Sequence, residues 1–207
     1  DQSLDGNITF TDDATIDSDS ATVTTDSEEN ELLLRAGIGD ISFNANIGTA
    51  ETTGNLNGQL GDFTIEDTTG SVTFGGADAT SDNNDLANVT QVNTSGAINI
   101  GAGVDETAAT SDVILGGIFL NGGNNAAADT LQITTSGSDI RFNGAVQLQS
   151  GVTFTTSANK TDAANDQSLD GNITFTDDAT IDSDSATVTT DSEENELLLR
   201  AGIGDIS

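Results

Sequence analysis

The 207-residue sequence contains no Cys, His, Met, Trp, Tyr or Pro, and its only aromatic residues are eight Phe. Without Cys the chain has no disulfide framework, thiolate metal site or cysteine nucleophile. Without His it lacks the commonest general base and transition-metal ligand, so a Ser-His-Asp arrangement cannot form within it. The absence of Met is expected of an internal segment of a longer chain. Together these absences argue against an enzyme.

Basic residues are also scarce, with four Lys and Arg against 35 Asp and Glu and a formal net charge of −31. Such a charge argues against nucleic-acid binding by phosphate neutralisation and against docking on an anionic membrane. No apolar run approaches the roughly 18 residues that a membrane span needs. The charge indicates divalent-cation binding or a well-hydrated extracellular surface, or else it serves solubility alone.

The sequence repeats itself over a long distance. Residues 1–42 recur without change as residues 166–207, so the offset is 165 residues. We interpret 1–165 as one complete repeat of short stacked β-coils and 166–207 as the start of the next identical repeat, which predicts a tandem array. The duplicated segment contains 11 acids and one base, so one period has 24 acids, three bases and a net charge of −21. No Pro-, Gly- or Ser-rich linker precedes the second copy, which predicts a continuous rod.

A shorter pattern recurs inside the period: Gly, polar, Ile or Val, polar, Phe or Ile. This alternation is typical of a half-buried β-strand, and we expect the Gly to turn a tight corner with a positive φ. The pattern reads GNITF at 6–10, GDISF at 39–43, GSVTF at 70–74, GAINI at 96–100 and GNITF at 171–175, with variants GSDIRF at 137–142 and GGIFL at 116–120. The predicted core residues are Ile8, Phe10, Ile41, Phe43, Val72, Phe74, Ile98, Ile100, Ile140 and Phe142.

Further strands flank these corners. A strand precedes several of them, in LLLRAG at 32–37, FTIEDTTG at 63–70, VTQVNTSG at 89–96 and LQITTSG at 131–137, and a third strand follows the Phe. The only series of helix formers, SEENELLLRA at 27–36, ends where the other copies have a strand, so it is predicted as loop then strand. We expect about five to eight coils per period, which would rise about 24–38 Å at ~4.8 Å per coil.

Short alternating strands fit either a β-sandwich or a β-solenoid. The return of one pattern at successive coils favours the solenoid, as does the lack of Trp and Tyr. The outward positions of the pattern are mostly uncharged, which avoids repulsion between like charges stacked about 4.8 Å apart. Asp40 and Asp139 are exceptions, and Arg141 could partly offset Asp139. The prediction is an all-β chain, a β-solenoid continuous across tandem 165-residue repeats.

With GNITF, GDISF and GSVTF and the preceding FTI and LQI strands in view, the chain resembles the β-strand-repeat surface proteins of bacteria. These are similar to β-helix adhesins and fibres of the filamentous-haemagglutinin type. The resemblance covers essentially the whole chain and implies a right-handed β-helix, secretion, and a role in adhesion or surface fibres. It supplies no catalytic residues. The unchanged 165-residue period departs from it, being much longer than a single coil.

Candidate binding sites are few. The acidic clusters at 12–19, 26–31, 78–85 and 105–106 are predicted loops, and Asp12, Asp13, Asp17 and Asp19 are candidate Ca²⁺ ligands because carboxylates are hard oxygen donors. Their spacing does not match an EF-hand and no GGxGxD repeat occurs, so solvated loops are the alternative. Paired carboxylates could perform glycosidase chemistry, but no aromatic sugar platform lies nearby. Asn-x-Ser/Thr occurs at Asn7, Asn88, Asn93, Asn159 and Asn172, about as often as chance predicts.

The sequence favours a structural role over an enzyme. The leading hypothesis is an extracellular fibre or surface-stalk segment, without a cofactor, whose partners are adjacent repeats. The alternative is the spacer of a large adhesin that carries a separate domain to a foreign surface, and a variant of this alternative is a spacer stiffened by Ca²⁺. Both place the chain outside the cell or on its surface. Lateral bundling at −21 per period would need screening or bridging cations, and an uncapped end would expose unpaired strand edges.

Overall fold

The computed structural model describes residues 6–11, 14, 16–18, 30–48, 59–75, 91–101, 113–121, 130–156, 171–176, 179–183, 196–201 and 204–207. Within these residues the chain forms 15 β-strands and no helix. Every pair of neighbouring strands is parallel. The predicted all-β class is therefore confirmed, and the structure shows that its sheets are parallel.

The strands form three sheets, named here A, B and C. Sheet A has the order β1 (Ile8–Phe10), β3 (Ile41–Phe43), β5 (Val72–Phe74), β8 (Ile114–Leu120), β11 (Gly144–Leu148) and β14 (Ile181–Asp182). Sheet B has the order β6 (Gln91–Thr94), β9 (Thr130–Thr135), β12 (Gly151–Thr155) and β15 (Leu197–Arg200). Sheet C has the order β2 (Leu32–Leu34), β4 (Phe63–Ile65), β7 (Ile98–Ile100), β10 (Ile140–Phe142) and β13 (Ile173–Phe175).

Isolated bridges extend two of the sheets. Ile16 pairs with Ile47, which in turn pairs with Val92 of β6, so both isoleucines belong to sheet B. Leu60 joins the same sheet by pairing with Thr94, and Ile206 joins sheet C by pairing with Ile173 of β13. With these bridges included, the chain passes through sheets A, B and C in that order again and again. One such pass is called a cycle below.

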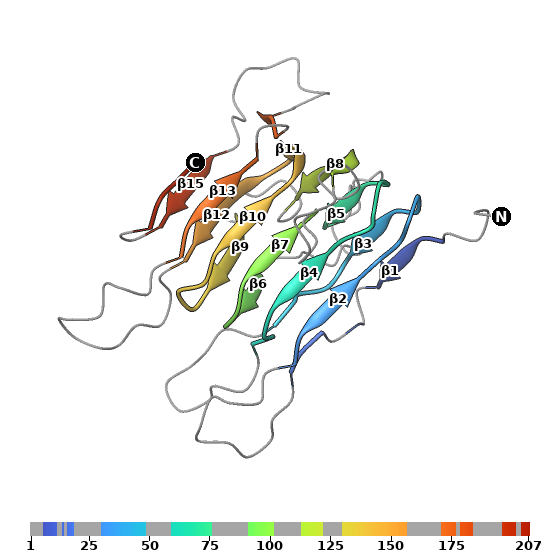
Figure 1. The fold of residues 1–207 in the computed structure, drawn as a ribbon, viewed down its shortest axis with the longest axis horizontal. Helices are drawn as coiled ribbons and strands as arrows, with labels where there is room; N and C mark the ends of the chain where they lie inside the picture. The colour runs from blue at the N-terminus through green and yellow to red at the C-terminus, as the bar shows by residue number, and fades with distance from the viewer. Residues whose placement is uncertain are drawn as a thin grey trace, which may run out of the picture.

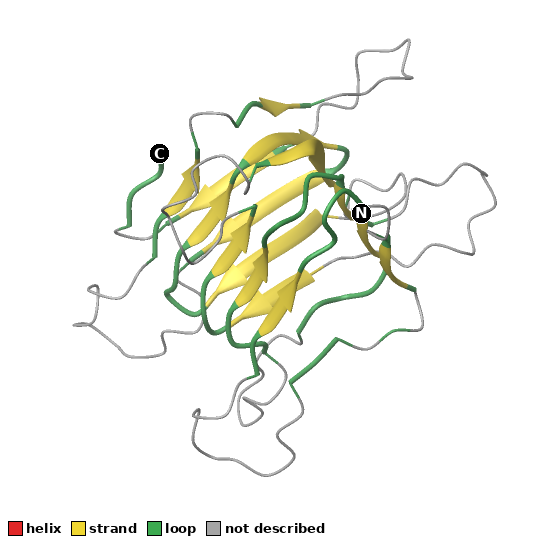
Figure 2. Ribbon diagram, turned by 45° about the vertical axis from the view of Figure 1, so that its right-hand side comes forward, coloured by secondary structure: helices red, strands yellow, loops and turns green. Residues whose placement is uncertain are grey.

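Successive cycles stack along one direction, so that in Figure 1 the colour passes from blue at β1 and β2 to red at β15. The strands of each sheet lie side by side in layers (Figure 2). The length of a cycle varies, from 21 residues between the paired positions Leu131 and Val152 to 46 residues between Val72 and Ile118. The strands thus recur in the same three sheets in every cycle, while the segments between them differ in length, as expected of a stack with variable loops.

The core forms because equivalent apolar residues stack in register. Ile41 lies between Ile8 and Val72, and their outward neighbours alternate with them along each strand. The inward side chains of all three sheets belong to one hydrophobic cluster. Burying each such side chain contributes about 1.5–3 kcal/mol. A single three-residue strand buries little surface, so the stability of each cycle depends on its neighbours.

Phenylalanine rings form two stacks within this core. The ring of Phe43 lies parallel to the rings of Phe10 and Phe74, with centroids 5.1 and 5.0 Å apart. Phe63 of sheet C meets Phe43 edge-on at 5.6 Å, which ties sheet C to sheet A. In later cycles Phe142 stacks on Phe175 in sheet C at 5.6 Å, and Phe154 of sheet B meets both rings edge-on. Offset stacking and edge contacts are the arrangements that aromatic rings prefer.

Of the ten residues expected in the core, eight are at most 1% exposed, and Ile8 and Phe10 are partly buried against the cluster. The eight are Ile41, Phe43, Val72, Phe74, Ile98, Ile100, Ile140 and Phe142. Leu32–Leu34 forms β2, in the second half of the segment predicted as loop then strand.

Two features of the Gly-polar-apolar pattern were not evident from the sequence. Its strands do not all stack in one sheet, because the first three lie in sheet A and those at 98–100, 140–142 and 173–175 lie in sheet C. The positive φ proposed for its glycines is found only in the two variants, at Gly117 and Gly137, and not in any of the five regular copies. In the regular copies the requirement for glycine comes instead from the close approach of the preceding cycle, described below.

Candidate functional site: the corners that stack one cycle on the next

The corner before the first three strands of sheet A contains a row of side chains that bond to the neighbouring cycle. The Asn7 Oδ1 accepts a hydrogen bond from the backbone N–H of Asp40 at 2.9 Å. One cycle later, Asp40 Oδ1 accepts hydrogen bonds from the Ser71 N–H at 2.7 Å and from the Ser71 hydroxyl at 2.8 Å. Each side chain thus satisfies a backbone donor that the turning chain would otherwise leave without a partner.

The corner before sheet C repeats the arrangement. Asp62 Oδ1 accepts from the Ala97 N–H at 2.6 Å, and Asp139 Oδ1 accepts from the Asn172 N–H at 2.7 Å. Asn172 Oδ1 in turn accepts from the Asp205 N–H at 2.8 Å. The exceptional acids among the outward positions, Asp40 and Asp139, are therefore acceptors in these rows. Within these rows the residue stacked on Asp40 is the neutral Ser71, and the residue stacked on Asp139 is the neutral Asn172. This alternation limits repulsion between stacked charges.

The hydrogen bonds from Ser71 also act on the charge of Asp40. The backbone N–H of Ser71, and after it the Ser71 hydroxyl, lower the pKa of Asp40 from its ordinary value of 3.8, while slight desolvation opposes them. Hydrogen bonds donated to a carboxylate favour its charged form. This corner therefore holds Asp40 ionised and ties the stacking contact to pH.

The glycine at each of these corners is required by the packing of one backbone on another. A Cβ atom placed on Gly39 would lie 2.4 Å from the carbonyl oxygen of Gly6, and one placed on Gly171 would lie 2.1 Å from that of Ser138. A Cβ on Gly6, by contrast, meets nothing within 4 Å. The glycine is needed wherever another cycle lies beneath the corner, since real Cβ atoms do not approach backbone oxygens so closely.

A column of threonines lines the inside of the corner between sheets B and C. Thr94, Thr135 and Thr156 are fully buried. Their hydroxyls donate to the backbone carbonyls of Gly96, Ser138 and Gly171 at 2.8, 2.5 and 2.7 Å. Because each buried hydroxyl is satisfied, the column fixes the turn without an unpaired polar group in the core.

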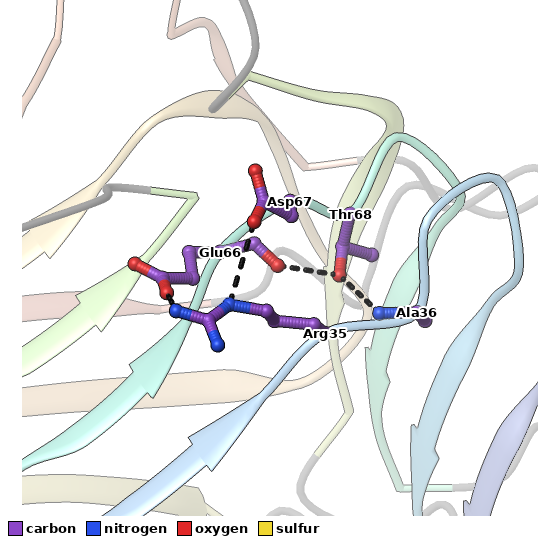
Figure 3. A network of polar contacts seen from close by, with 5 residues as sticks. All are labelled: Arg35, Ala36, Glu66, Asp67 and Thr68. Carbon is purple, nitrogen blue, oxygen red and sulfur yellow. Dashed lines mark hydrogen bonds and ion pairs between the residues drawn. The ribbon is translucent and has the colours of Figure 1, made fainter. Parts of the chain in front are cut away.

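The corner between β2 and β3 is reinforced by a charged network that sequence reasoning did not identify (Figure 3). The Arg35 guanidinium donates through Nη2 to Glu66 Oε1, and its Nε lies 3.4 Å from Asp67 Oδ2. The Glu66 side chain is only 8% exposed whereas that of Arg35 is 56% exposed. Thr68 Oγ1 donates to the Glu66 carbonyl and accepts from the Ala36 N–H, both at 3.0 Å. The spacing of about one cycle between Arg35 and Glu66 is the only sequence signal for this pair.

Asn93 in β6 is buried and 5% exposed. Its Nδ2 is the one buried side-chain N or O atom without a hydrogen-bond partner in the part of the chain that the structure describes. Asn93 pairs with Thr134 of β9 on one side of its strand. On the other side, its neighbours Val92 and Thr94 pair with Ile47 and Leu60, which come from two separate segments of the chain. The Asn-x-Ser/Thr site at Asn93 is therefore enclosed in a sheet and is not available for glycosylation in the folded chain.

Of the four candidate Ca²⁺ ligands, only Asp17 lies within the described residues. Asp12, Asp13 and Asp19 lie outside the described residues, and Asp17 is exposed next to the Ile16 bridge of sheet B. Across the described ranges, no group of three or more acidic residues could hold a metal ion. No helix in the same part of the chain is long and apolar enough to cross a membrane.

No protein-family model, no curated protein and no solved structure matches this chain. The proposals below therefore rest on the stacking corners themselves, whose hydrogen bonds, ion pair and close backbone contacts all connect one cycle to the next.

Proposed function

We propose that the chain is a structural segment of an extracellular fibre or surface stalk, in which tandem 165-residue repeats form one right-handed β-solenoid. The supporting observation is that the second copy of the duplicated segment makes the same contacts as the first. The Ile8 N–H donates to the Asp40 carbonyl, and the Ile173 N–H donates to the Asp205 carbonyl, both at 2.9 Å.

The corner of the second copy matches in further detail. The Gly39 N–H donates to the Ala36 carbonyl at 2.9 Å, and the Gly204 N–H donates to the Ala201 carbonyl at 2.7 Å. A Cβ on either glycine would clash with the carbonyl one cycle below, at 2.4 and 2.1 Å. Equal contacts in both copies support a stack that continues from one repeat into the next.

The second copy is also joined to the body of the chain. Ile173 of β13 pairs with Ile140 of β10, and Leu197 of β15 pairs with Val152 of β12. A repeat boundary of this kind resists bending, because hydrogen bonds and core packing cross it as they cross every other cycle. Right-handed connections between parallel strands are the general rule, which supports the proposed hand.

Length is the first test of this function. Chains of one, two and three periods, each followed by residues 1–42, should appear in electron microscopy as straight rods whose length grows in proportion to the number of periods. Their midpoints of chemical denaturation should rise with length, because terminal cycles lack one neighbour. Globular particles, or midpoints that do not change with length, would contradict the proposal.

The native assembly is the second test. Antibodies against this chain should label long uniform filaments or surface stalks. An adhesin spacer would instead appear as short rods that end in a different domain, and rods that shorten or soften in chelator would indicate stiffening by Ca²⁺. Intracellular labelling alone would contradict the extracellular location.

A further inference from the structure

The duplicated segment lies on different sheets in its two copies. The strand GNITF belongs to sheet A as β1 and to sheet C as β13. Three other positions of the segment are displaced in the same way. In the second copy each lies in the sheet that precedes its first-copy sheet in the repeating order A, B, C. Ile16 is in sheet B and Ile181 in sheet A, β2 is in sheet C and β15 in sheet B, and Ile41 is in sheet A and Ile206 in sheet C.

The displacement arises at one place in the period. From Ile8 to Ile41 and from Ile41 to Val72, the Gly-polar-apolar pattern returns after a full cycle, so its strands stack in sheet A. From Val72 to Ile98 the chain passes only through β6 in sheet B before the pattern recurs in sheet C. The remaining steps, to Ile140 and Ile173, are full cycles again. The period therefore falls one sheet short of five cycles.

We propose that each 165-residue period of a tandem array is rotated by two thirds of a turn, about the stacking axis, relative to the period before it. This inference rests on the proposed solenoid, in which one cycle is one turn. Between β1 and β11 the chain completes four cycles, and it then crosses sheet B to reach sheet C at β13. One period is thus four and two-thirds turns, or about 22 Å at ~4.8 Å per turn, which is fewer than the five to eight coils expected.

The core can continue through such a junction. In the first copy, Phe10, Phe43 and Phe74 stack with interplanar angles of 3° and 13°. Phe175, the counterpart of Phe10, stacks on Phe142 at 14°. In an array the counterparts of Phe43 and Phe74 would follow Phe175, which gives four stacked rings across the boundary. The rotation thus places a repeat boundary inside an unbroken aromatic stack.

The rotation determines what the surface of an array presents. The outward residues Thr9, Ser42 and Thr73 of sheet A recur on sheet C in the next period and on sheet B in the one after. Every surface element is displayed on all three sides, and it returns to the same side after three periods, which is 14 turns or about 67 Å. A partner that binds one element, including a second array, finds it on every side. Any bend built into one period cancels over three, so the rod is straight.

Cysteine cross-linking of the 207-residue chain tests the rotation, because the chain has no native Cys. Thr174 pairs with Arg141 in sheet C, and Asp182 pairs with Gln147 in sheet A. The double variants Arg141→Cys/Thr174→Cys and Gln147→Cys/Asp182→Cys should each cross-link with a short bifunctional thiol reagent, because neighbouring strands lie within its reach. The variant Gln147→Cys/Thr174→Cys should not cross-link, since its two residues lie in different sheets.

The outcomes separate the rotation from the solenoid. Cross-linking of Gln147→Cys/Thr174→Cys in place of the two expected pairs would place the second copy of GNITF in sheet A. That result would overturn the rotation and leave the solenoid standing. If none of the three pairs cross-links, although each reduced variant retains the circular dichroism of the parent, the second copy does not stack on the first, and both the rotation and the continuous solenoid are wrong.

Discussion

The carboxylate of Asp40 accepts two hydrogen bonds from Ser71 of the next cycle, at 2.7 Å from the backbone N–H and at 2.8 Å from the hydroxyl. The variant Asp40→Ala removes this acceptor and leaves a corner N–H without its partner. We expect the free energy of unfolding to fall by about 1.5–3 kcal/mol, the usual contribution of a hydrogen bond to a charged group. Urea denaturation of the 207-residue chain measures this loss.

The duplication supplies the matched control. Asp205 is the same residue in the second copy, and the 207-residue chain places no serine above it. Asp205→Ala should therefore change the unfolding free energy much less than Asp40→Ala. Equal losses for the two variants would show that the carboxylate acts within its own strand and not on the next cycle.

The same contact predicts a pH dependence. Since Ser71 lowers the pKa of Asp40 below its ordinary value of 3.8, the stabilisation is complete above that value and is lost as the pH falls through the lower pKa of the folded state. The variant Asp40→Asn keeps a side-chain oxygen acceptor, as Asn7 shows, but cannot titrate. The stability advantage of the parent over Asp40→Asn should thus be constant near neutral pH and shrink below about pH 4. Acidification also relieves repulsion among the other carboxylates, but this effect is shared by the parent and Asp40→Asn and therefore cancels in the difference between them.

Gly6 and Gly171 occupy the same position in the two copies but should differ in their tolerance of the same substitution. A Cβ on Gly171 would lie 2.1 Å from the Ser138 carbonyl oxygen, whereas a Cβ on Gly6 meets nothing within 4 Å. Gly171→Ala should cost about 2–3 kcal/mol through overpacking against backbone, and Gly6→Ala should be close to neutral. Thermal unfolding of both variants checks this, and equal tolerance would mean that no cycle lies beneath the second copy.

Arg35 neutralises a carboxylate that is otherwise buried. Glu66 is 8% exposed at its side chain and pairs with the half-exposed Arg35. Arg35→Ala should cost about 1–3 kcal/mol, because it leaves Glu66 desolvated without its donor. The double variant Arg35→Ala/Glu66→Gln should recover part of that loss. Arg200, the counterpart of Arg35 in the second copy, has no later Glu66 counterpart in the 207-residue chain, so Arg200→Ala should change stability little.

The positions of most strands could be predicted from the sequence because alternation is a local property of three or four residues. The core positions Phe43 and Ile140 could be assigned from this alternation. The sheet to which each strand belongs could not be assigned, because GNITF has the same local pattern in sheet A as β1 and in sheet C as β13. That choice depends on how many strands intervene, and the segments between strands vary too much in length for the sequence to reveal it.

The corner contacts were equally hidden. Asp40 and Asp139 stood out in the sequence as charges in a mostly uncharged row, yet their role depends on Ser71 and Asn172, which lie 31 and 33 residues away. The sequence analysis explained the corner glycines by their backbone freedom, whereas the structure requires glycine because a neighbouring cycle occupies the space where a Cβ atom would lie. A contact between cycles leaves no signal within one strand.

The phenylalanine stack gives the most direct measure of how far stability comes from neighbouring cycles. Phe43 is fully buried between Phe10 and Phe74, whereas Phe10, in the first cycle, is only partly buried against the core. Phe43→Ala should cost about 3–5 kcal/mol, because it leaves a cavity that the rigid sheets cannot close. Phe10→Ala should cost clearly less, although both residues occupy the same place in the pattern. Similar losses in urea denaturation would show that the pattern itself, and not the position in the stack, sets the contribution of each ring.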